Sequence, residues 1–77
     1  MSTRFPVVTS KQIVRVLEKI GFAFVRQTGS SHAIYKRLTD NKRTVVPTHS
    51  GIPLKRRTLK SILNDVGLNV DALRDLL

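Results

Sequence analysis

Cysteine is absent from this chain of 77 residues. Without cysteine, neither a disulfide framework nor a thiolate zinc site is available to stabilise so short a protein. The absence fits a reducing compartment, and we expect a cytoplasmic protein. The sequence also lacks any run of 18 apolar residues and any basic-then-apolar leader. We therefore expect neither membrane insertion nor secretion.

Acidic residues are scarce. Five Asp and Glu stand against 14 Lys and Arg, for a formal net charge of +9 and a pI near 11.3. The five show no paired-carboxylate or His-x-x-x-His spacing, so we expect no metal and no cofactor. The excess of basic residues is typical of nucleic-acid binding, because neutralising phosphates releases condensed counterions. Eight of the fourteen lie between positions 36 and 60, with only Asp40 against them: Lys36, Arg37, Lys42, Arg43, Lys55, Arg56, Arg57 and Lys60.

The length predicts one small domain over residues 1–77, with residues 1–8 as an extended or frayed lead-in. A chain this short buries only about 60% of the surface that its unfolded form exposes. There is no room for separate binding and catalytic domains, so one surface must do both.

The first half of the chain predicts one helix and three strands. Thr9 and Gln12 form a capping-box pattern, an apolar stripe at helical spacing follows, and Gly21 is placed to end a helix over Ser10–Ile20. β-branched and aromatic runs then predict strands over 22–27, 32–37 and 43–47, joined by short turns. Sequential strands with short connections imply an antiparallel meander, with Pro47 at a strand end or an edge.

The second half predicts two helices. After a loop over 48–54, apolar residues at i, i+3, i+4 and i+7 indicate a helix over Arg57–Val66 that Gly67 ends, and Asn69 is suited to cap a last short helix. Because two helices with one apolar stripe each cover one sheet face, we expect a two-layer α+β fold. The other face of its three-stranded sheet, or its rim, should be open to solvent or a partner.

His32 is the candidate for chemistry. Its unperturbed pKa, about 6.5, lets an imidazole take and give a proton near neutral pH. The preceding Gly29, Ser30 and Ser31 offer amide and hydroxyl donors for an anion, and Lys36 lies on the same strand face. RNA cleavage by the substrate's own 2′-hydroxyl needs a base, an acid and cations, and this segment has the residue types for it.

Alternative interpretations of these residues stay open. On position alone, an isolated histidine in a small domain is usually a structural or merely exposed residue. His49 is a second candidate for proton transfer or a plain loop residue, and its distance from His32 cannot be derived from the sequence. The run Lys55, Arg56 and Arg57 precedes a helix N-terminus, where bases and amides together would face phosphate; otherwise it is a solvated charge run.

Three segments occur in order along the chain: Gly29-Ser30-Ser31-His32 between two strands, Val45-Val46-Pro47-Thr48-His49-Ser50, and Thr58-Leu59-Lys60-Ser61-Ile62-Leu63 at the start of a helix. Together, over about Ser10 to Leu68, they resemble the HicA toxins of bacterial and archaeal toxin–antitoxin pairs. One departure is Arg57, which stands where members of the family commonly carry glycine.

The resemblance implies a double-stranded-RNA-binding-domain-like fold and a ribonuclease that cuts messenger RNA and is neutralised by a HicB antitoxin. It also implies that His32 is the catalytic histidine. We expect a metal-independent endoribonuclease, with a non-catalytic basic RNA-binding module as the alternative. The residues expected to contact RNA are Gly29, Ser30, Ser31, Lys36, Lys55, Arg56, Arg57 and Lys60.

Overall fold

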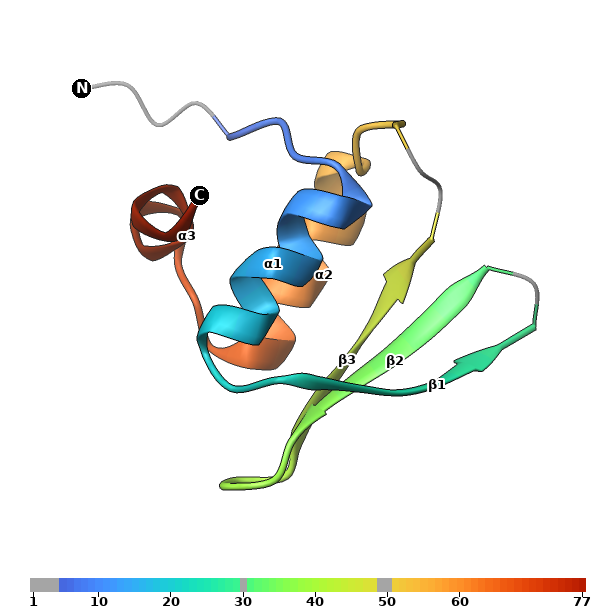
Figure 1. The fold of residues 1–77 in the computed structure, drawn as a ribbon. Helices are drawn as coiled ribbons and strands as arrows, with labels where there is room; N and C mark the ends of the chain where they lie inside the picture. The colour runs from blue at the N-terminus through green and yellow to red at the C-terminus, as the bar shows by residue number, and fades with distance from the viewer. Residues whose placement is uncertain (1–4, 30, 49–50) are drawn as a thin grey trace.

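The computed structural model describes residues 5–29, 31–48 and 51–77, and within them the chain folds as helix, three strands and two helices (Figure 1). The predicted order of elements and the α+β class are confirmed, and each predicted bound lies within one residue of the observed bound. The elements are α1 (Ser10–Lys19), β1 (Ala23–Thr28), β2 (His32–Arg37), β3 (Lys42–Pro47), α2 (Arg56–Val66) and α3 (Val70–Leu76).

Local signals account for the helix ends. The Thr9 side chain accepts the backbone N–H of Gln12 at 3.2 Å, and the Gln12 side chain accepts the backbone N–H of Thr9 at 2.8 Å, which completes the predicted capping box. Gly67 ends α2 in the left-handed conformation at φ 78°. The Asn69 side chain accepts the N–H of Ala72 at 2.8 Å and caps α3.

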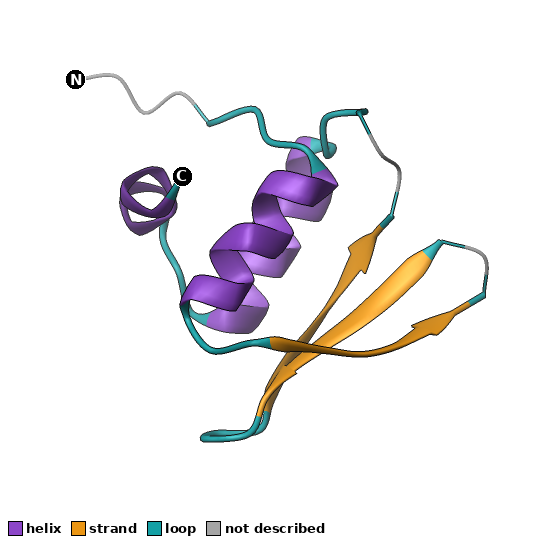
Figure 2. Cartoon of the chain, viewed as in Figure 1, coloured by secondary structure: helices purple, strands orange, loops and turns teal. Residues whose placement is uncertain are grey.

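The three strands form an antiparallel sheet in the order β1-β2-β3, as the meander predicted. His32 pairs with Thr28 on one side and with Pro47 on the other, so the first residue of β2 lies opposite the last residues of β1 and β3. A bulge interrupts β1 between Phe24 and Arg26. Figure 2 shows α1 and α2 on the same side of the sheet. The helices therefore cover one face of the sheet and leave the other open, as expected.

The alternation of β2 decides which side chains reach the core. Ala33 and Tyr35 belong to the hydrophobic core, and Ile34 is equally buried but lies outside that cluster, on the helix-free side. His32 and Lys36 share the side of Ile34. Burial, and secondarily the charge of Glu18, raises the pKa of the Tyr35 hydroxyl. Tyr35 thus packs in the core.

The predicted lead-in ends in a residue of the core. Its described part, residues 5–8, forms no helix or strand, but Val8 is only 1% exposed and belongs to the core. The N–H of Leu54 donates to the carbonyl of Val8 at 2.8 Å. Val8 is therefore held in place rather than frayed, because it packs on the core just before the capping box.

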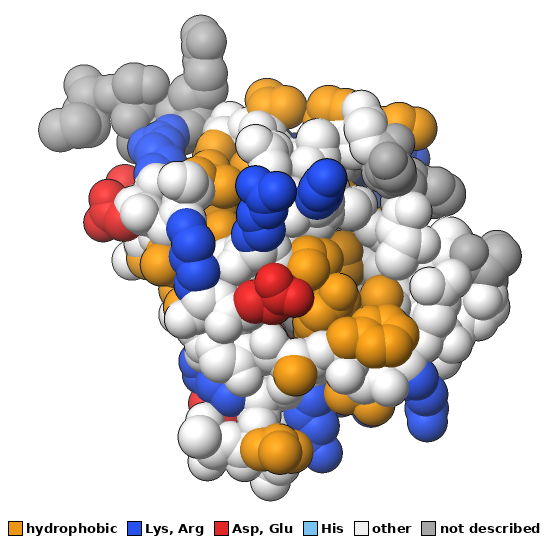
Figure 3. Space-filling model, viewed as in Figure 1, with side chains coloured by type: hydrophobic (Ala, Val, Ile, Leu, Met, Phe, Trp, Pro, Cys, Tyr) orange, Lys and Arg blue, Asp and Glu red, His pale blue; other side chains and the backbone are white. Residues whose placement is uncertain are grey.

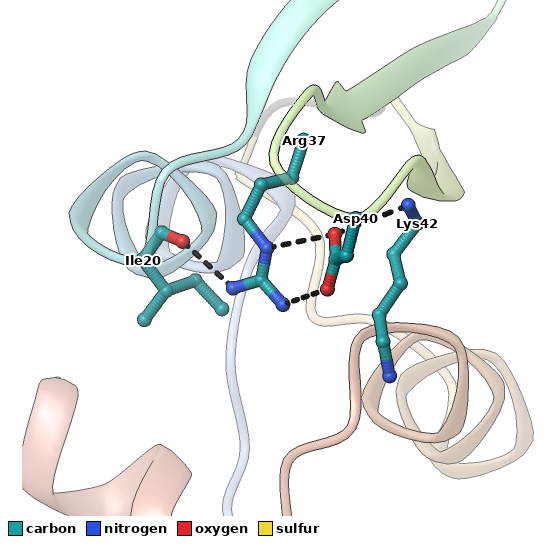
Figure 4. Close-up of polar contacts among 4 residues, drawn as sticks. All are labelled: Ile20, Arg37, Asp40 and Lys42. Carbon is teal, nitrogen blue, oxygen red and sulfur yellow. Dashed lines mark hydrogen bonds and ion pairs between the residues drawn. The ribbon is translucent and has the colours of Figure 1, made fainter.

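At the far end of β2, Arg37 joins three parts of the fold (Figure 4). Its Nε and Nη2 donate to the two carboxylate oxygens of Asp40 at 3.1 and 2.8 Å, and its Nη1 donates to the carbonyl of Ile20 at 2.9 Å. The guanidinium also lies 4.8 Å from the ring centroid of Phe22. The hydrogen bonds from Arg37 lower the pKa of Asp40 to about 2. We call Arg37, Asp40 and Lys42 the turn end of the sheet.

Candidate functional site

A cleft opens at the end of the sheet opposite to the turn end. In Figure 1, β3 runs toward the level at which α1 and α2 begin, and His32 pairs with Pro47 there. The cleft has a volume of about 260 Å³. We call it the histidine cleft, and its lining residues are Ser10, His32, Pro47, Ile52, Pro53, Leu54, Lys55 and Thr58.

Tertiary hydrogen bonds hold the walls of the histidine cleft. The N–H of Thr48 donates to the carbonyl of Ser31 at 2.8 Å and extends the β2–β3 ladder past His32. The buried hydroxyl of Ser10 donates to the carbonyl of Pro47, which fastens the end of β3 to the start of α1. The strand that carries His32 is therefore fixed, through β3, relative to the start of α1.

His32 is exposed at the first position of β2. No described residue forms a hydrogen bond with its imidazole ring. Both ring nitrogens are consequently available to a molecule that enters the cleft. A histidine in this setting is able to accept a proton at one nitrogen and to donate one from the other when charged.

The first turn of α2 contributes to the lining of the same cleft. Lys55 at the N-cap makes no side-chain capping bond, and this turn contains no acidic residue. The first amides of a helix have no intrahelical acceptor, and the helix dipole favours an anion beside them. Lys55 and Thr58 both line the histidine cleft, so an ammonium and a hydroxyl join those amides. This part of the cleft lining thus favours a negatively charged group.

The basic run before α2 separates in space. Lys55 lines the histidine cleft, but the Arg56 guanidinium lies 5.1 Å from the ring centroid of Phe5 and lines a different pocket. Arg57 and Lys60 are exposed on α2 and are not part of the cleft lining. Of these four predicted RNA contacts, only Lys55 is brought to His32.

The other predicted contacts have different places. Lys36 shares the sheet side of His32 but lies four positions along β2, roughly 13 Å away, opposite Arg43. Gly29 is exposed in the β1–β2 turn at φ 60°. Ser31 uses its backbone carbonyl in the sheet ladder. Ser30, and His49 as the second candidate for proton transfer, lie outside the described residues.

Six cleft residues were not singled out from the sequence as contacts: Ser10, Pro47, Ile52, Pro53, Leu54 and Thr58. Ser10 looked like the first residue of a helix, and Thr58 belonged to a helix-start motif without an assigned contact. Their one available signal was position, since both stand at the beginning of a helix. Tertiary folding brings them to His32 from positions 22 and 26 residues away in the chain.

Charge alone does not locate this site. On the face shown in Figure 3, basic side chains are spread over the molecule and are not confined to one spot. Among residues 5–29, 31–48 and 51–77, the two ion pairs are Arg37–Asp40 and Arg74–Asp71, and neither lines the histidine cleft. The same residues contain no group of three His, Asp or Glu that could hold a metal ion. No helix within them is long and apolar enough to cross a membrane.

A comparison with protein families matches residues 10–68 to the model described as the HicA toxin of bacterial toxin–antitoxin pairs. The match covers more than half of the chain, from the start of α1 to just beyond α2, and so includes His32, Lys55 and Thr58. No curated protein matches the sequence.

Proposed function

The chain belongs to the HicA toxin family of bacterial toxin–antitoxin systems, and we propose that it is a metal-independent endoribonuclease that cleaves messenger RNA. The observation that carries this proposal is the histidine cleft. Exposed His32 lines a cleft of about 260 Å³ together with Lys55 and Thr58 from the start of α2. A proton-transfer group thus shares a cleft with a helix start suited to a phosphate.

The reaction that suits this cleft is attack by the 2′-hydroxyl of RNA on the adjacent phosphate. His32 accepts the 2′-hydroxyl proton as the O2′–P bond forms, or donates a proton to the leaving 5′-oxygen as the P–O5′ bond breaks. The products are a 2′,3′-cyclic phosphate and a 5′-hydroxyl. A positioned histidine in either role typically contributes about 10²–10⁴-fold in rate.

Lys55 supplies the electrostatic part of this proposal. Negative charge accumulates on the non-bridging oxygens while the phosphorus is five-coordinate, and a preorganised cation and amide dipoles stabilise that charge. Lys55 is the basic side chain in the cleft lining, and Thr58 adds a hydroxyl donor. The second proton-transfer group is His49 or a lysine, and Lys55 is the lysine that lines the cleft.

The antitoxin completes the proposal. Membership of the family implies an antitoxin partner, and we assign this role to a HicB-type protein that neutralises the toxin. We expect purified antitoxin to stop RNA cleavage at equimolar concentration. A toxin that remains active beside a tightly bound antitoxin would contradict this part of the proposal.

The test uses two RNA oligonucleotides that differ only by a single 2′-deoxy nucleotide at the position the toxin cleaves. In the presence of EDTA, the all-ribose RNA should be cut to leave a 5′-hydroxyl end, and the 2′-deoxy RNA should remain intact at that position. Equal cleavage of both oligonucleotides, or loss of cleavage in EDTA, would overturn the mechanism. Tight binding without any product would indicate the alternative, a non-catalytic RNA-binding module.

A further inference from the structure

The histidine cleft has an apolar wall that RNA cleavage by itself does not explain. Ile52 is 61% exposed at the cleft and belongs neither to the hydrophobic core nor to the side chains packed against it. Folding of the described residues therefore makes little use of this side chain. Single exposed apolar residues are common on protein surfaces, so the exposure of Ile52 gains meaning only from the residues around it.

The lining of the cleft divides into two chemical halves. His32, Lys55 and Thr58 are polar, and the other half consists mainly of Pro47, Ile52, Pro53 and Leu54. A pairing of Thr9 with Pro53 and the hydrogen bond from Leu54 to Val8 fix the apolar half to the start of α1. A ligand that satisfies both halves carries an anion at one end and a flat apolar surface at the other.

We propose that the histidine cleft takes one unpaired nucleotide, with its phosphate against Lys55 and Thr58 and its base against Ile52 and Pro53. The substrate class is then single-stranded RNA, and Ile52 is a base-contacting residue. This inference rests on the proposed function, because it concerns the nucleotide beside the bond that His32 would help to break.

The size of the cleft supports a single nucleotide. Pockets for drug-sized ligands typically span about 300–1,000 Å³, and this cleft has about 260 Å³. In an A-form duplex the bases are stacked on one another, so their flat faces are covered and only their edges are reached, through the wide, shallow minor groove. Only an unpaired nucleotide presents a phosphate and an open base face together, and Ile and Pro are among the apolar side chains that proteins insert beside unstacked bases.

The charges of the cleft favour a nucleotide over a protein segment. The cleft lining includes Lys55 and the positive end of α2, and the whole chain has a net charge of +9. An apolar antitoxin side chain would fill only the half with Ile52. A nucleotide satisfies both halves, since its phosphate neutralises the polar one.

The first experiment compares one RNA sequence as a single strand and as a complete duplex, in cleavage and in binding. We expect the single strand to be cleaved and bound at least about ten-fold better than the duplex. Equal cleavage and equal binding of the single strand and the duplex would overturn the inference. If neither form is cleaved, the proposed function fails, and the comparison of binding still decides whether the cleft prefers an unpaired nucleotide.

The second experiment replaces Ile52 with alanine. The matched control is Leu38→Ala, because Leu38 is 83% exposed in the β2–β3 turn and far from the cleft lining. Ile52→Ala should raise KM for single-stranded RNA about ten-fold and change kcat little, because the lost contact is a binding contact. Leu38→Ala should change neither constant.

An abasic nucleotide beside the cleaved bond makes this test specific to the base. Removing the base should raise KM for the natural protein, and Ile52→Ala should add little further on the abasic RNA, because both changes delete one contact. Independent, additive effects would contradict the base contact. An Ile52→Ala protein with normal KM but weaker antitoxin binding would show that the apolar wall serves the antitoxin, and the inference would be wrong.

Discussion

The two ends of the sheet use positive charge in opposite ways. At the turn end, Arg37 is held by both carboxylate oxygens of Asp40, by the carbonyl of Ile20 and by the ring of Phe22. At the histidine cleft, Lys55 begins a helix without a capping bond and without an acidic residue in the first turn. Charge that is neutralised within the chain stabilises the fold, and charge that is left unneutralised is available to a phosphate.

Raising the salt concentration should give the largest difference between the two ends: RNA affinity should fall, and thermal stability should not. If the RNA interface contains about six phosphate contacts, affinity should fall a few hundred-fold between about 50 and 200 mM salt, because each contact releases condensed counterions. The Tm should change little over the same range, because the Arg37 cluster is one short-range contact. Filter binding and thermal denaturation in the same buffers measure both. A flat salt response of RNA binding would count against a phosphate-dominated interface.

Removing one basic side chain from each end of the sheet should show that only the histidine cleft binds phosphate. Lys55→Ala should weaken RNA binding about ten-fold at low salt and lower the slope of log K against log salt by about 0.7, the value for one contact to a single strand. The matched variant at the turn end is Lys42→Ala, which should leave both quantities unchanged because Lys42 pairs with Arg37, at the end of the sheet away from the histidine cleft. Equal losses from the two variants would mean that the ends do not differ in their use of charge.

Arg37→Ala should have the converse effect. It removes the paired hydrogen bonds to Asp40, the bond to Ile20 and the contact with Phe22, so the free energy of unfolding and the Tm should fall. Urea denaturation measures the loss, with Arg43→Ala as the control, since Arg43 is exposed and forms no ion pair among the described residues. Cleavage per folded molecule should stay normal in Arg37→Ala. A folded Arg37→Ala protein that has lost cleavage would contradict a purely stabilising role for the turn end.

Asp40 should give the smallest effect, visible in its pH dependence. The pKa of Asp40 is lowered from 3.8 to about 2 by Arg37, so its contribution to stability is complete above about pH 4 and is lost as the pH falls toward 2. Asp40→Asn should therefore be less stable than the natural protein at neutral pH, and the two stability curves should converge near pH 2. Urea denaturation as a function of pH measures the difference. A constant difference down to pH 2 would assign the effect to something other than ionisation of Asp40.

Most of the fold could be predicted because its signals are local. The capping box of Thr9 and Gln12, the left-handed Gly67 and the capping Asn69 each act within a few residues of a helix end. The β-branched and aromatic runs and the short turns between them are likewise local signals, and they predicted the strands. The core position of Val8 was not predicted because a lone apolar residue has no period, and its backbone partner, Leu54, is far along the chain.

The candidate site was predictable only in part. His32 was singled out by its residue type and by the turn before it, and Lys55 by its place before a helix. The sequence could not separate Lys55 from Arg56, because only the folded chain turns Arg56 toward Phe5. Ser10 and Ile52 reach the cleft from distant positions, so no spacing rule could have found them.

The most direct test of the account is the single-turnover rate of RNA cleavage by His32→Ala, measured at saturating protein together with RNA affinity. His32 is exposed and no described residue is hydrogen-bonded to its ring, so the variant should fold and bind RNA within about two-fold of the natural protein. Its rate should fall by about 10²–10⁴-fold, the usual contribution of a positioned histidine. An unchanged rate would contradict the assignment of His32 and of the cleft around it.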